Sequence, residues 1–108
     1  MKRLLILRDS FGPSVADGAE AHAFKQAILA PLLDGVDDVI LDFSGIRSAN
    51  SSFVNGLLRG LFAEHGEGLL RRITFKGCLP AVQVLVQGAI ELGLMNHGEA
   101  AKPRQALR

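Results

Sequence analysis

The chain of 108 residues contains no tryptophan, no tyrosine and only one cysteine, Cys78. A single cysteine has no partner within the chain, so the sequence excludes a scaffold held by disulfides. No apolar run approaches the roughly 20 residues of a membrane-spanning helix. The run at residues 4–7 is also shorter than the core of about 7–15 residues that a signal peptide needs. We expect a cytoplasmic protein without a membrane partner.

An excess of charge is also missing, because the formal net charge is +1. Such a small charge gives no strong field to attract nucleic acid. Arg71, Arg72 and Lys76 form only a modest basic cluster, and we expect no nucleic-acid partner. Residues 9–42 carry seven acidic residues and one lysine, whereas residues 43–108 carry eight basic and four acidic residues. This asymmetry fits either a bipolar surface for a protein partner or two halves whose charges cancel on folding.

Recognised motifs for catalysis, metals and cofactors are missing too. His22, His65 and His97 lie far apart, and none has a cysteine, histidine or acidic residue at a recognised metal-ligand spacing. There is neither a glycine-rich phosphate loop nor the nucleophile turn of a serine hydrolase. Cys78 follows a turn glycine, and we interpret it as a structural residue. We expect no enzyme, no metal and no cofactor.

The composition is that of a globular domain, with 48% hydrophobic and 21% charged residues. Periodicity predicts six elements in the order βαβαβα. The strands are expected at Lys2–Arg8, Val39–Phe43 and Leu69–Lys76, and the helices at about 14–30, 50–65 and 80–93. The continuous apolar run in the second strand favours burial on both faces and therefore parallel pairing. We predict an α/β fold with a small, mostly parallel or mixed sheet packed by helices.

The first helix has two candidate caps, Ser14 and Asp17. Pro31 should end or kink this helix near Ala30, because proline lacks an N–H and clashes with the preceding turn.

The third helix is apolar almost all round, so it needs cover from the sheet or from another chain. A homodimer through this helix is one prediction. Gly93 suits its C-terminal cap. The sequence turns polar from Asn96, and we place the domain at residues 1–95 and a loosely held tail at residues 96–108.

One junction stands out, where the second strand passes into the second helix. Asp42 lies at the strand end, Arg47 lies in the loop, and Asn50, Ser51 and Ser52 open the helix. Functional groups gather where strand ends meet helix starts in parallel α/β layers. The N–H groups and dipole of a helix start favour an anion, such as a phosphate on either serine. Asparagine and serine are also the best helix caps, which is the simpler explanation.

A row of small residues continues along the same helix. Ser52, Gly56 and Gly60 recur every four residues, and each interior glycine costs about 1 kcal/mol relative to alanine. Close packing inside the domain would offset this cost. A flat face flanked by Asn55 and Arg59, against which a partner lies, would offset the cost equally well.

The residues at this junction also carry a resemblance to a known family. Residues 39–46 form a strand that runs into Asp-Phe-Ser-Gly, and residues 49–58 open a helix with Ser-Ser. This pair resembles the STAS-type domain, which includes the bacterial anti-sigma-factor antagonists. It is most similar to the STAS-like group of uncharacterised function, whose helix opens with Ser-Ser-Phe. The motif region covers residues 39–62, and the element order extends the resemblance to about residues 2–93.

The resemblance implies a function and a role for individual residues. Ser51 corresponds to the serine that a partner kinase phosphorylates in the antagonists, and Ser52 to the residue after it. Asn50 stands where the antagonists have aspartate, and Phe53 where they have glycine. The implied function is a non-enzymatic regulatory module with a protein partner such as a histidine-kinase-like ATPase. The expected partner-binding residues are Arg47, Asn50, Ser51, Ser52, Asn55, Gly56 and Arg59.

An alternative function is a small-ligand or nucleotide sensor. Backbone amides at the helix start and Arg47 would then hold an anion. Some STAS domains are thought to bind nucleotides, whereas the missing glycine-rich phosphate loop argues against this alternative.

Overall fold

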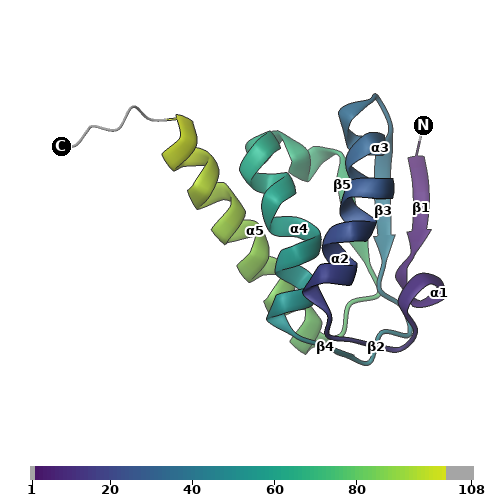
Figure 1. The fold of residues 1–108 in the computed structure, drawn as a ribbon. Coiled ribbons are helices and arrows are strands. Elements are labelled where there is room, and N and C mark those ends of the chain that lie inside the picture. The colour runs from purple at the N-terminus through teal and green to yellow at the C-terminus, as the bar shows by residue number, and fades with distance from the viewer. Residues whose placement is uncertain (1, 102–108) are drawn as a thin grey trace.

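The structure is a computed structural model that describes the backbone of residues 2–101 and the side chains of residues 2–97. Its main sheet has three parallel strands in the order β1-β3-β5 (Figure 1). Their bounds are β1 (Lys2–Ile6), β3 (Asp38–Asp42) and β5 (Ile73–Lys76). Parallel neighbours need long crossover connections, and helices supply them here. The predicted α/β fold with a small parallel sheet packed by helices is confirmed.

The third strand is shorter than predicted. Residues 69–71, which the sequence assigned to it, belong to a 3-10 helix, η2 (Gly66–Arg71). The apolar side chain of Leu69 suggested a strand, and it is buried in the core from this 3-10 turn instead. A buried leucine gives the same apolar signal in the sequence whether it lies in a strand or in a 3-10 helix.

The first helical segment runs through three elements, α2 (Gly18–Phe24), the π-helical η1 (Lys25–Leu29) and α3 (Ala30–Asp34). Pro31 was predicted to end or kink this helix near Ala30. The helix does not end there, because α3 contains Pro31 in its first turn. A π-helical turn precedes this proline and shifts the hydrogen-bond pattern just where the N–H is missing. The distortion is local, and the helix continues to Asp34.

Three short elements were not predicted: α1 (Leu7–Phe11), β2 (Ser14–Val15) and β4 (Ser48–Ala49). Of the two candidate caps for the first helix, Asp17 is used, and Ser14 lies in β2. The Asp17 carboxylate accepts hydrogen bonds from the backbone N–H groups of Ala19 at 2.8 Å and Glu20 at 3.2 Å.

The last two helices, α4 (Ser51–His65) and α5 (Pro80–Ala101), pack side by side (Figure 1). The prediction that Gly93 caps α5 is wrong, because the helix continues to Ala101. Gly93 is buried against α4, where an added Cβ would lie 2.6 Å from the Arg59 carbonyl oxygen. The expected tail thus begins within a helix at Asn96, and residues 102–108 lie outside the described residues.

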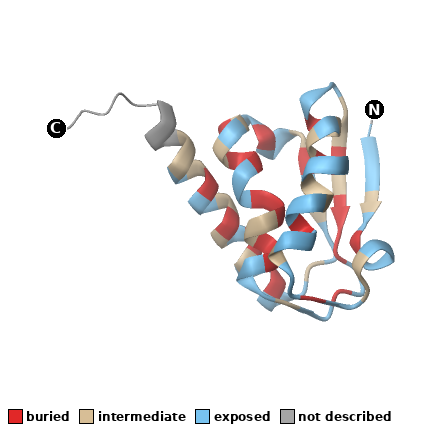
Figure 2. Cartoon of the chain, viewed as in Figure 1, coloured by how far each residue is buried: buried red, intermediate tan, exposed pale blue. Residues whose placement is uncertain are grey.

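The core lies between the helices and one face of the sheet. Val39 and Leu41 of β3 are buried, whereas Ile40, on the other face, is half-buried. Its neighbour in β1, Leu4, is 52% exposed, and most of β1 is exposed in Figure 2. The expected parallel pairing is present, but β3 is not fully buried on both faces. Likewise α5 leaves Val84, 68% exposed, without cover from the described residues.

Candidate functional site

The carboxyl ends of the three main strands and the amino ends of α4 and α5 gather at one end of the molecule, with β2 and β4 (Figure 1, lower side). The short strands pair in parallel, Ser14 with Ser48 and Val15 with Ala49. The backbone N–H of Arg47 donates to the carbonyl oxygen of Pro13 at 2.7 Å. These bonds fix the loop before α4, while the Arg47 side chain remains exposed.

Of the asparagine and serines that the sequence offers as caps at the amino end of α4, Asn50 is used. Asn50 is extended, and its Oδ1 accepts a hydrogen bond from the backbone N–H of Phe53 at 2.9 Å. Ser51 and Ser52 stand exposed in the first turn. Phe53 is 1% exposed and packs edge-on against Phe11, with ring centroids 5.0 Å apart. Phe53, which stands where the antagonists have glycine, therefore anchors the helix in the core and does not crowd the surface.

The two serines differ in their surroundings. An added Cβ at Gly18, the first residue of α2, would lie 2.6 Å from the hydroxyl oxygen of Ser52. A group attached to Ser52 would therefore meet α2. Ser51 precedes it, directly after the capping residue, at the start of the helix.

Asp42 lies at the end of β3 and is 8% exposed. Its Oδ1 accepts a hydrogen bond from the backbone N–H of Ser44 at 2.8 Å. Hydrogen bonding from the Ser44 hydroxyl and from this N–H lowers the pKa of Asp42, against the effect of burial, and the charge of Lys76 adds to the lowering. Asp42 is thus a carboxylate that orders the turn after the strand, and its fixed charge is not suited to proton transfer at neutral pH.

Cys78 follows β5 at the same end of the sheet and is half-buried. Burial raises the pKa of its thiol, and the negative charge of Asp42 raises it further. The thiol is therefore protonated at neutral pH, and a nucleophilic cysteine requires the opposite shift. The structural interpretation of Cys78 agrees with this environment.

The row of small residues on α4 is covered by the same chain at Gly56, whereas Ser52 and Gly60 are exposed. An added Cβ at Gly56 would lie 2.5 Å from the carbonyl oxygen of Gly18, and one at Gly60 would lie 2.7 Å from Lys25 Nζ. Gly56 therefore lets the backbone of α2 approach α4 closely, whereas the neighbour of Gly60 is only the end of a flexible lysine side chain. We correct the assignment of Gly56 to a partner-facing surface, because backbone of the same chain already occupies that side.

Two further residues of the expected partner surface lie farther along α4. Arg59 is exposed, and its guanidinium donates two hydrogen bonds of 3.1 Å to the side-chain oxygen of Asn96 in the amide orientation that suits both groups. This contact directs Arg59 toward α5. Asn55 is half-buried. The exposed set at the amino end of α4 thus comprises Arg47, Asn50, Ser51 and Ser52.

A groove between β5 and α5 was not predicted. It has a volume of about 640 Å³, and its walls include Ile73 and Phe75 of β5 and Val86 and Ile90 of α5. The sequence shows these residues only as parts of two apolar elements. Their position along a common groove depends on the packing angle of α5, which periodicity does not specify.

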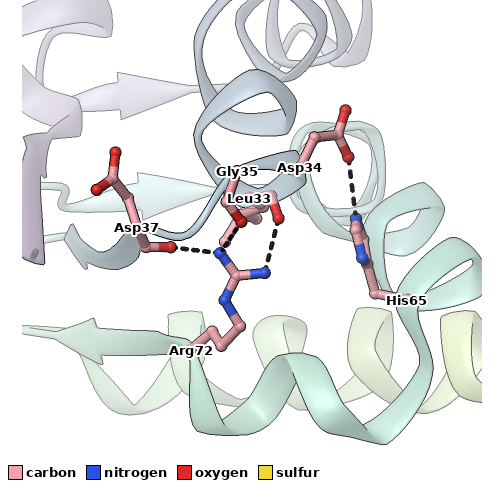
Figure 3. Close-up of polar contacts among 6 residues, drawn as sticks. All are labelled: Leu33, Asp34, Gly35, Asp37, His65 and Arg72. Carbon is pink, nitrogen blue, oxygen red and sulfur yellow. Dashed lines mark hydrogen bonds and ion pairs between the residues drawn. The ribbon is translucent and has the colours of Figure 1, made fainter.

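The opposite end of the molecule is organised by Arg72, which the sequence showed only as part of a basic cluster. Its guanidinium donates to the carbonyl oxygens of Leu33 at 2.7 Å, Gly35 at 2.9 Å and Asp37 at 2.6 Å (Figure 3). It also lies 3.6 Å from the carboxylate of Asp38. A cation thereby satisfies carbonyl groups at the end of α3, where the helix dipole favours positive charge.

The fold and the junction together define a class: a small parallel α/β layer with polar residues where a buried strand leads into a helix. The comparison with family models agrees, because residues 20–83 match the STAS-like domain of unknown function. The chain belongs to this family. Neither the curated proteins nor the solved structures that were compared gave a match. STAS-like domains are generally non-catalytic, and a general regulatory role fits the family.

No helix among residues 2–101 combines the length and the apolar character needed to cross a bilayer.

Proposed function

We propose that this chain is a non-enzymatic regulatory module that binds a protein partner through the amino end of α4 and the loop before it. The partner is of the histidine-kinase-like ATPase class, as for the anti-sigma-factor antagonists that the junction resembles. Phosphorylation of Ser51 switches the contact. The cytoplasm is the compartment in which such a partner and ATP are available.

One observation carries this proposal: Ser51 is exposed at the first position of a helix whose cap and core anchor come from its neighbours. Asn50 holds the helix start by its bond to the Phe53 N–H, and the Phe53 ring is buried. The Ser51 hydroxyl can therefore be modified without removing a contact that folds the helix.

A phosphate at this position acts in two ways. It adds nearly two negative charges beside the positive end of the α4 dipole, which tolerates them within the domain. It also places charge and bulk on a surface that a partner would have to desolvate, which weakens the complex. Asn50 supports this step, because the neutral amide does not repel the phosphate as an aspartate at that position would.

The test is phosphorylation by a co-purifying ATPase of this class. The wild-type chain, Ser51→Ala and Ser48→Ala are each incubated with the ATPase and ATP, and intact mass is measured. Ser48 is the matched control, because it is an exposed serine in β4, shortly before the helix. We expect one phosphoryl group on wild type and Ser48→Ala and none on Ser51→Ala. No gain on wild type, or an equal gain on Ser51→Ala, would contradict the proposed switch.

Two alternatives stay predictions. A nucleotide held at the start of α4 would raise the thermal stability of the free chain, by about 2.7 kcal/mol at 100 times the dissociation constant. A homodimer through α5 would cover the exposed side chains of Val84 and Met95, which are 68% and 62% exposed. Light scattering on the free chain measures that association.

A further inference from the structure

Two helices end beside each other at the end of the molecule opposite the phosphorylation candidate. Asp34 is the last residue of α3, and Glu64 and His65 are the last two residues of α4. One nitrogen or oxygen atom from each of the three side chains lies within 4.8 Å of the other two. Asp34 and Glu64 are exposed, and His65 is half-buried. Three potential metal ligands from two helices therefore converge on one point.

The histidine is the unusual member of this cluster. Its Nε2 is buried and has no hydrogen-bond partner among the described residues. The carboxylate oxygen Oδ1 of Asp34 lies 3.6 Å from this nitrogen (Figure 3). An N–H···O hydrogen bond spans about 2.7–3.2 Å, so this pair is too far apart to satisfy the nitrogen. A buried polar atom without a partner is rare, and it calls for a group that would complete it.

The separation of 3.6 Å agrees with two ligands of one metal ion. Zinc binds histidine nitrogen and carboxylate oxygen at about 2.0–2.2 Å, and two such atoms at the tetrahedral angle lie about 3.4 Å apart. His65 and Asp34 would hardly have to move. The Glu64 oxygen lies within 4.8 Å of the other two ligand atoms. It therefore has to approach them by at most about 1.4 Å, which a rotation of this exposed, unbranched side chain provides.

The surrounding charges favour a cation. The carboxyl ends of α3 and α4 present the negative ends of their dipoles, and two carboxylates add formal charge. Arg72 is the opposing positive group nearby, but it is turned toward the carbonyl oxygens of α3 and toward Asp38. Figure 3 shows its hydrogen bonds to the carbonyl oxygens of Leu33, Gly35 and Asp37.

We propose that Asp34, Glu64 and His65 bind a zinc ion that links the carboxyl ends of α3 and α4. One imidazole and two carboxylates suit zinc, whereas magnesium and calcium prefer sites of oxygen alone. Three protein ligands leave the fourth position to water. The ion connects segments that are far apart in sequence, so zinc stabilises the folded chain. This site is independent of the switch at Ser51, which lies at the other end of α4.

The experiment is calorimetric titration of the untagged, chelator-treated chain with zinc chloride and with magnesium chloride, together with thermal unfolding under the same conditions. We expect one zinc ion per chain, an unfolding temperature that rises with zinc, and no comparable effect of magnesium. Asp34→Asn and His65→Gln should each weaken zinc binding by about tenfold or more and abolish the thermal shift. Both variants keep a side chain of similar size, and Asp34 is exposed, so the fold is retained in at least one of them.

Matched controls separate this site from adventitious zinc ligands. His22→Gln removes an exposed histidine of α2, and Cys78→Ser removes the only thiol. Both controls should bind zinc as wild type does. The proposal is overturned if wild type binds no zinc, if both site variants bind it unchanged, or if a control loses binding to the same extent.

Discussion

At its amino end, α4 is held by a bond within its own first turn, from the Phe53 N–H to Asn50 Oδ1 at 2.9 Å. At the other end of the molecule, where α4 stops, Arg72 joins segments that lie 35 to 39 residues apart in sequence. A local cap leaves the neighbouring Ser51 hydroxyl available for modification, because Asn50 rather than Ser51 holds the helix start. The long-range hydrogen bonds of Arg72 leave little room for modification, because they hold distant segments together. We therefore propose regulation at the first end, whereas the bonds of Arg72 give structural support at the second.

The largest effect is expected from Arg72→Ala. It removes a half-buried guanidinium that donates to three carbonyl groups, and hydrogen bonds to charged groups contribute more than neutral ones. We expect the free energy of unfolding to fall by about 2–4 kcal/mol in urea denaturation. Arg71→Ala is the matched control, because Arg71 is exposed in η2, and it should change stability by less than about 0.5 kcal/mol. Equal effects of the two substitutions would show that the cluster acts only through its total charge.

The second prediction concerns the middle of α4. Gly56→Ala should destabilise the chain by about 1–3 kcal/mol, because the new Cβ would lie 2.5 Å from the Gly18 carbonyl oxygen. Gly88→Ala in α5 is the control, since no atom of the described residues lies within 4 Å of its Cβ position. There the helix propensity of alanine should stabilise by about 0.5–1 kcal/mol. Thermal unfolding of both variants measures the difference, and stabilisation by Gly56→Ala would contradict the close approach of α2.

The same contrast explains what the sequence could predict. The start of α4 could be predicted because its sequence signals are local. A cap residue, two serines and an apolar stripe lie within a few positions of one another. Arg72 gave no such signal, because its acceptors, such as the Leu33 carbonyl, lie in a distant segment. The sequence could not predict that Asp34 lies beside His65 for the same reason. Spacing rules for metal ligands cover only residues that are close in sequence.

Glycine and proline show a different limit. Gly93 has the sequence signal of a helix cap, but it serves close packing between α5 and Arg59 of α4. Both uses need a residue without a Cβ, so the sequence does not distinguish them. Pro31 predicts a disturbed helix, and the disturbance is present as the π-helical η1. What the sequence does not reveal is that the helix continues beyond it.

The smallest effect belongs to the cap itself. Asn50→Ala removes the side-chain acceptor of the Phe53 N–H and should lower the free energy of unfolding by about 1 kcal/mol. Asn50→Asp keeps an acceptor oxygen and should retain most of the stability. Urea denaturation of both variants and of Arg72→Ala measures how much each end of the molecule contributes to the free energy of unfolding. If Asn50→Ala cost as much as Arg72→Ala, the helix start would be part of the rigid support, and its first turn would be a poor place for a switch.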